Sequence, residues 1–140
     1  MSKVKPYVRK PHYYETDQMG IIHHSNYIRW FEEARLHFLD EVDIPYDKIE
    51  EEGIMIPVLS VSTNFIESVK YKEEISIYVK ITAFNGVRMT IEYEIHSNEK
   101  NKLCNTGVTT HCFVDKNFKV VNLKKTNLDL YQKFLNNTEK

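Results

Sequence analysis

The chain has 140 residues, of which 41% are hydrophobic and 28% charged, and its formal net charge is −1. This composition is typical of one globular domain over residues 1–140 and excludes a disordered chain. A near-neutral charge without a basic stripe argues against nucleic-acid binding, and no apolar run reaches the roughly 20 residues of a membrane span.

The first predicted elements are a strand and a long helix. A short strand is expected over residues 5–14, where two prolines limit its pairing. A helix is expected over residues 25–42, capped by Ser25 or Asn26. Four of its apolar residues recur at positions i, i+4, i+7 and i+11 of a helical stripe: Tyr27, Phe31, Ala34 and Phe38. Because further apolar residues widen the stripe, most of the helix surface should be buried.

After a shorter helical turn over residues 46–51, the hydrophobic period changes to two, which is typical of half-buried strands. The predicted strands cover residues 59–65, 75–81, 87–96, 103–114 and 118–121. Asn85-Gly86 is a strong hairpin turn signal. A terminal helix is expected to begin at Thr126 or Asn127 and to end at Asn136.

This order of elements predicts an α+β fold in which an antiparallel sheet wraps around one long central helix. Nothing else in the chain can cover so apolar a helix. The edges of such a sheet are long, so pairing with a second copy of the chain is an expected way to cover them.

The two cysteines and the absence of a signal-peptide core point to a reducing, cytoplasmic location. If Cys104 and Cys112 share one strand, they lie further apart than the ~7 Å limit for a disulfide. No spacing of His, Cys and carboxylate residues resembles a metal site, and we expect no cofactor.

The most specific stretch of the sequence is YYETDQMGIIHHSNYIRWFEEAR, residues 13–35. Its core, Asp-x-x-Gly-(x)3-His-x-Asn-Tyr, resembles the hotdog-fold acyl-CoA thioesterases, in the branch of 4-hydroxybenzoyl-CoA thioesterase and the Tol-Pal-associated acyl-CoA thioesterase. The resemblance implies that Asp17 is the catalytic carboxylate, with His24 and Tyr13 beside it. It also implies a homodimer or homotetramer, with each thioester site between the helix start of one subunit and the strands of its neighbour.

The chemistry of thioester hydrolysis fits these positions. The carbonyl oxygen gains negative charge when it is attacked, and N–H groups at a helix start stabilise such charge. The N–H of His24 is the best candidate donor. Asp17 would act from the opposite side, either as a general base for water or as a nucleophile that forms a mixed anhydride. Tyr13 is either a core aromatic residue or a residue that positions Asp17.

Further residues are expected to bind the substrate. The turn residue Gly20 and the helix start lie near the thioester, the helix and a neighbouring subunit line the acyl tunnel, and basic side chains meet the coenzyme A phosphates. These residues are Gly20, Asn26, Tyr27, Phe31, Val61, Thr63, Lys70 and Arg88. Ordinary solvated charge is the alternative interpretation of Lys70 and Arg88.

The other histidines are expected to be structural or exposed, including His23 and a hydrogen-bonded sheet residue, His111. The 4-hydroxybenzoyl branch carries another residue at the position of His24, which favours the general acyl-CoA branch. Two alternatives stay open. An acyl-carrier-protein thioesterase would need a basic docking surface around the tunnel mouth. A non-catalytic acyl-CoA-binding protein or scaffold would not need Asp17.

Overall fold

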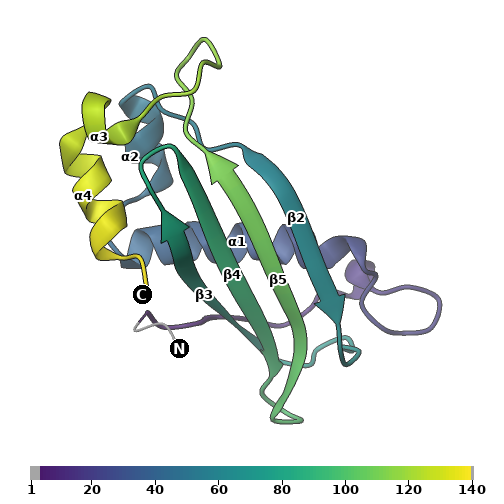
Figure 1. The fold of residues 1–140 in the computed structure, drawn as a ribbon. Helices are drawn as coiled ribbons and strands as arrows, with labels where there is room; N and C mark the ends of the chain where they lie inside the picture. Colours follow the sequence, from purple (N-terminus) through teal and green to yellow (C-terminus); the bar gives the residue numbers. More distant parts are fainter. Residues whose placement is uncertain (1–3, 140) are drawn as a thin grey trace.

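The structure is a computed structural model, and it describes residues 4–139. Its five strands form one antiparallel sheet in the order β1-β3-β4-β5-β2, and the long helix α1 crosses one face of it (Figure 1). The strands are β1 (Tyr7–Arg9), β2 (Val58–Phe65), β3 (Ile75–Phe84), β4 (Arg88–Ser97) and β5 (Lys102–Cys112). The helices are the 3-10 turn η1 (Tyr13–Glu15), then α1 (Ser25–Glu41), α2 (Tyr46–Glu51), α3 (Leu123–Thr126) and α4 (Leu128–Asn136). The predicted α+β architecture around α1 is confirmed.

The core lies between α1 and the sheet, and Phe31 is at its centre. Phe31 is fully buried, and its ring stacks on that of Tyr93 with 4.5 Å between the ring centroids. Gly107 lies on β5, the strand next to that of Tyr93, and a Cβ atom at this position would lie 2.3 Å from the Phe31 ring. The missing side chain of Gly107 therefore allows α1 to approach β5 closely.

Several predicted boundaries are wrong. Only Tyr7–Arg9 of the first predicted strand pairs with the sheet, and η1 follows it. Residues 118–121 form no strand: they turn back on residues 113–115, and their only ladder pairing in the described residues is an isolated bridge from Val120 to Val114. The terminal helix is divided into α3 and α4 at Asn127, whose side chain accepts the N–H of Leu130.

The start of α1 also differs from the prediction. The N-cap residue is His24, and neither Ser25 nor Asn26 takes that position. No side chain caps the helix there. Its first N–H groups are therefore satisfied in other ways.

Strand β2 forms one edge of the sheet. It pairs with β5 on one side, and no other strand of residues 4–139 pairs with its outer edge. Large apolar side chains along it are exposed: Val58, Leu59, Val61 and Phe65. A long apolar edge of this kind is a surface for pairing with another chain.

Neither cysteine forms a disulfide: Cys104 and Cys112 are both buried and free. Within residues 4–139, no helix is long and apolar enough to cross a membrane.

Candidate active site

The loop that carries Asp17 connects η1 to α1. Its turn is made possible by Gly20, which adopts a φ of +78°. The carboxylate of Asp17 is half-buried, and its Oδ1 accepts the N–H groups of Met19 at 2.8 Å and Ile21 at 3.4 Å. The other oxygen, Oδ2, has no hydrogen bond from any described residue. One carboxylate oxygen is thus held by the loop and the other is available to a ligand.

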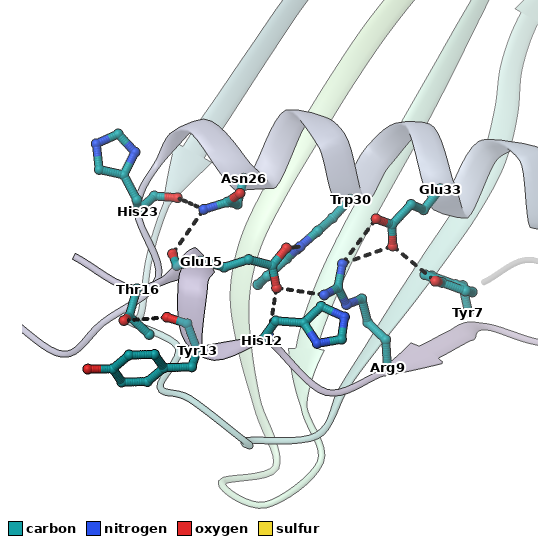
Figure 2. Close-up of polar contacts among 10 residues, drawn as sticks. All are labelled: Tyr7, Arg9, His12, Tyr13, Glu15, Thr16, His23, Asn26, Trp30 and Glu33. Atoms are coloured by element: carbon teal, nitrogen blue, oxygen red, sulfur yellow. Dashed lines mark hydrogen bonds and ion pairs between the residues drawn. The ribbon is translucent and has the colours of Figure 1, made fainter.

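A buried carboxylate two residues earlier fixes this loop to the core (Figure 2). Glu15 is 4% exposed, and its carboxylate accepts Nη2 of Arg9 at 2.6 Å, Nε1 of Trp30 at 2.8 Å and the N–H of His12 at 2.7 Å. Arg9 also pairs with Glu33 on α1 at 2.9 Å. Since these partners lie on β1 and α1, η1 is held against both elements.

The main chain of Glu15 ties the loop to the helix start. Its carbonyl oxygen accepts the N–H of His23 at 2.8 Å and the side-chain amide of Asn26 at 2.9 Å. Asn26 is only 5% exposed. Asn26 is predicted from the sequence to bind substrate, whereas in the structure its amide forms a hydrogen bond that joins η1 to α1.

One N–H group at the helix start has no partner among residues 4–139. The N–H of Ser25 donates to Nδ1 of His23 at 3.2 Å, and the N–H of Asn26 donates to the His23 carbonyl at 3.0 Å. The N–H of His24 donates to no described residue. His23 therefore satisfies the first two N–H groups of α1, and the N–H of His24 is left for an incoming oxygen.

Asp17, His24 and Tyr27 line one cleft of about 280 Å³, together with Phe65 and Glu67 from the end of β2 and the segment after it. The ring of Phe65 meets that of Tyr27 edge-on, with 5.2 Å between the centroids. Burial raises the pKa of Tyr27 to about 12, so its phenol keeps its proton at neutral pH. Of the eleven predicted site residues, three meet in this cleft.

The other predicted residues of the loop and helix lie outside the cleft. Tyr13 is 74% exposed and packs edge-on against Tyr71, with 5.6 Å between the ring centroids. Gly20 faces open space, and Phe31 lies in the core. Lys70 pairs with Ile21 through the main chain, while its own side chain is exposed.

The predicted residues on the strands are further away within one chain. Val61 and Thr63 lie opposite Thr109 and Gly107 of β5, on the face of the sheet that α1 covers. Arg88 lies opposite Cys112, towards the end of the sheet where β2 begins. A single copy of the chain therefore does not bring these residues to the Asp17 cleft.

Sequence reasoning missed Phe65 and Glu67 as cleft residues. They lie more than 40 positions beyond Asp17 and carry no motif. The alternation of apolar and polar residues along β2 identifies Phe65 as a strand residue, but it cannot show which cleft its ring enters.

A sheet around one long helix is the architecture of the hotdog fold, and the cleft at the helix start holds a half-buried carboxylate. The model of the Thioesterase-like superfamily matches residues 11–128. "Putative acyl-CoA thioesterase YneP" of Bacillus subtilis is 31% identical over 114 residues, which cover 81% of this chain and 82% of that protein.

Solved structures agree with this match. A DHNA-CoA thioesterase from Staphylococcus aureus superposes with a TM-score of 0.89 at 30% identity, over 94% of this chain and 89% of that one. A 1,4-dihydroxy-2-naphthoyl-CoA thioesterase from Synechocystis has the same fold, with a TM-score of 0.82, 19% identity and coverage of 94% and 96%. The chain belongs to the thioesterase-like superfamily, and it is a thioester hydrolase with the hotdog fold.

Proposed function

We propose that the chain hydrolyses an acyl-CoA thioester to a free carboxylic acid and coenzyme A, with Asp17 and the N–H of His24 as its catalytic groups. The observation that carries this proposal is that Oδ2 of Asp17 and the N–H of His24 both lack partners among the described residues, while both residues line one cleft. Relatives support the choice of substrate: one of 31% identity is named as an acyl-CoA thioesterase, and one of 25% identity as a 1,4-dihydroxy-2-naphthoyl-CoA hydrolase.

In the general-base form of the mechanism, the thioester carbonyl oxygen accepts the N–H of His24 at the positive end of the α1 dipole. Asp17 takes a proton from water as the water oxygen bonds to the carbonyl carbon. The C–S bond then breaks, and the thiolate of coenzyme A takes that proton. A main-chain donor of this kind typically contributes about 3–4 kcal/mol to the stability of the transition state.

In the nucleophilic form, Asp17 attacks the carbonyl carbon itself, and a mixed anhydride forms as coenzyme A leaves. Water then cleaves the anhydride and regenerates the carboxylate. Both forms require the same free oxygen of Asp17. They differ in the covalent intermediate: only the nucleophilic form can carry a labelled solvent oxygen into the protein carboxylate during a single turnover, when water attacks the Asp17 carbonyl of the anhydride.

In this proposal each chain is a single domain. The active unit is a homodimer, or a homotetramer of two such dimers. The exposed apolar outer edge of β2 supports this assembly, because two such edges can join antiparallel and continue the sheet. The join would bring Val61 and Thr63 of one copy towards the Tyr27 side of the other. Lys70 and Arg88 are then the candidate contacts for coenzyme A phosphates. Two free buried thiols fit a cytoplasmic setting.

The test is thiol release from a panel of acyl-CoAs, from short to long chains and including benzoyl types, with acyl carrier proteins as a second panel. The proposal predicts turnover of at least one coenzyme A ester. Turnover of carrier-protein esters alone would support the alternative of an acyl-carrier-protein thioesterase. Tight binding of acyl-CoA without any release would support a non-catalytic acyl-CoA-binding protein.

A further inference from the structure

A second cleft lies at the opposite end of β2 from Asp17. It has a volume of about 320 Å³, and Val58 at the start of β2 is part of its wall. Most of the wall is apolar and comes from α1, β4 and the segment before β2: Leu36, Leu39, Ile56, Met89 and Ile91. Two charged residues of α1, Glu32 and Arg35, also line it.

The guanidinium of Arg35 has a neutral partner and, within residues 4–139, no ion pair with a carboxylate. Its Nη1 donates to the phenol oxygen of Tyr93 at 2.9 Å. The described part of the chain has no carboxylate within 4.0 Å of it, although Glu32 lies on the same wall. Arg9, by contrast, pairs with the carboxylates of Glu15 and Glu33.

The groups behind Tyr93 are neutral as well. Its phenol oxygen lies 2.7 Å from Oγ1 of Thr109, which lies 2.8 Å from Nε2 of His111. The phenol of Tyr93, the hydroxyl of Thr109 and the ring of His111 thus form one hydrogen-bonded chain, in which each hydroxyl can donate or accept. Burial, helped by the charge of Arg35, lowers the pKa of His111 to about 4, so the imidazole is neutral at pH 7. None of these three groups therefore carries a negative charge that would compensate the positive charge of Arg35.

An arginine in this setting is suited to bind an anion. A half-buried charge without a counter-ion has lost part of its hydration, and a ligand that brings the opposite charge restores that energy. The planar guanidinium has five N–H donors, and only one of them is used by Tyr93. The remaining donors match the two oxygens of a carboxylate, or a single ionised phenol oxygen.

The two clefts meet in the proposed dimer. Phe65 lines the Asp17 cleft and Val58 lines the Arg35 cleft, at opposite ends of the same edge strand. When two β2 edges join antiparallel, the start of one strand lies beside the end of the other. The Arg35 cleft of one copy then adjoins the Asp17 cleft of its partner.

We propose that Arg35 binds an acidic oxygen at the far end of the acyl group whose thioester lies over Asp17 of the other subunit. The substrate class is thus an acyl-CoA with a carboxylate or an acidic phenol distal to the thioester, and an apolar body that fills the second cleft. This inference rests on the proposed function, including the antiparallel dimer.

The test compares kcat/KM for pairs of substrates matched in size, one acidic and one neutral. Carboxyacyl-CoAs of increasing length are paired with straight-chain acyl-CoAs, and hydroxybenzoyl-CoAs with benzoyl-CoA, so that the two arms distinguish a carboxylate from a phenol. The native protein should prefer the acidic member of at least one pair by about tenfold or more. Arg35→Gln should lower that ratio at least tenfold, and Arg35→Lys should restore part of it.

The ratio is the informative quantity, because a merely structural role of Arg35 would lower kcat/KM for both members of a pair. The matched control is Arg29→Gln, on the exposed side of the same helix, which should leave the ratio unchanged. Turnover of neutral esters with no acidic preference, or a preference that survives Arg35→Gln, would overturn the inference and leave the proposed function intact.

If no coenzyme A ester is hydrolysed, the proposed function fails and a direct binding experiment decides the role of Arg35. Calorimetric titration with adipate and with 4-hydroxybenzoate would then be made on the native protein and on Arg35→Gln. Binding that is lost in the variant supports the acidic site. Equal binding by both proteins, or none by either, overturns it.

Discussion

The side-chain amide of Asn26 donates a buried hydrogen bond of 2.9 Å to the main-chain carbonyl of Glu15. The bond joins the first turn of α1 to the residue two positions before Asp17. The same carbonyl accepts the N–H of His23, so two donors from the helix start meet on one oxygen. These hydrogen bonds therefore hold the loop that carries Asp17 at a fixed position relative to the start of α1.

Replacing Asn26 by Asp tests this tie. A carboxylate at that position faces the Glu15 carbonyl with no proton to share, and the unmet hydrogen bond should cost about 1–3 kcal/mol of stability. Turnover should fall further than stability explains, because the loop moves relative to α1. Urea unfolding and kcat measure the two effects. Asn137→Asp is the control, since its amide also bonds a main-chain carbonyl, at 2.8 Å, but in an exposed position. Equal effects of the two substitutions would contradict the account.

Glu15→Gln should destabilise the protein far more than Glu33→Gln, although both carboxylates pair with Arg9. The side chain of Glu15 is 5% exposed, and that of Glu33 is 42% exposed. Removing one charge of a buried pair typically costs about 3–5 kcal/mol, whereas an exposed pair contributes about 0–1 kcal/mol. The difference in the free energy of unfolding between the two variants checks the prediction. Similar losses would show that Glu15 does not anchor η1.

Gly107→Ala should destabilise the protein by about 1–3 kcal/mol, because the new methyl group overlaps the ring of Phe31. In a double-mutant cycle, Phe31→Leu should recover part of that loss by withdrawing the ring. The cycle measures the coupling between the two positions, and residues in contact typically differ from additivity by 0.5–3 kcal/mol. Strictly additive losses would mean that Phe31 does not lie against Gly107.

The stability of the protein should fall as the pH is lowered from about 6.5 to 4. His111 is fully buried, with a pKa of about 4 against an ordinary value of 6.5. Between these values the unfolded chain binds a proton that the folded chain does not, so acid favours unfolding. The contribution of His111 is complete above pH 6.5, and about 3 kcal/mol of it is lost below pH 4.

Urea unfolding at pH 7.5 and at pH 4.5 measures this change, with His111→Gln as the comparison. The variant has no imidazole to protonate, so its stability should change less between the two pH values. If the native protein and the variant lose the same amount, other groups account for the acid sensitivity.

The sequence predicts α1 to within one residue at its end, because its apolar period persists over four turns and no local signal competes with it. It fails at residues 118–121, where the alternation is present but the segment turns back on residues 113–115 and forms an isolated bridge instead of a ladder. The motif around Asp17 identifies the loop and the helix start. Arg35 belongs to the same stretch, yet its contact with Tyr93 spans 58 positions, and no periodicity reports a pairing over that distance.

The roles of His23 and Asn26 show the same limit at short range. Both residues lie within the motif, and residue type alone suits either of them to binding substrate. Only the backbone geometry reveals that the Nδ1 of His23 accepts the N–H of Ser25 and that Asn26 bonds Glu15. The hydrogen-bond partners of a short loop depend on where its neighbours in space lie.

The most direct test of the account compares thiol release by the native protein, Asp17→Asn and Asp115→Asn on one turned-over acyl-CoA. Asp115 is a matched control, because its Oδ1 accepts the N–H groups of Asn117 and Lys119 just as that of Asp17 accepts those of Met19 and Ile21. Asp17→Asn should keep its melting temperature and lose turnover by about 10²–10⁴-fold, while Asp115→Asn remains at the native rate. A folded Asp17→Asn variant that hydrolyses the substrate at the native rate would contradict the assignment of Asp17.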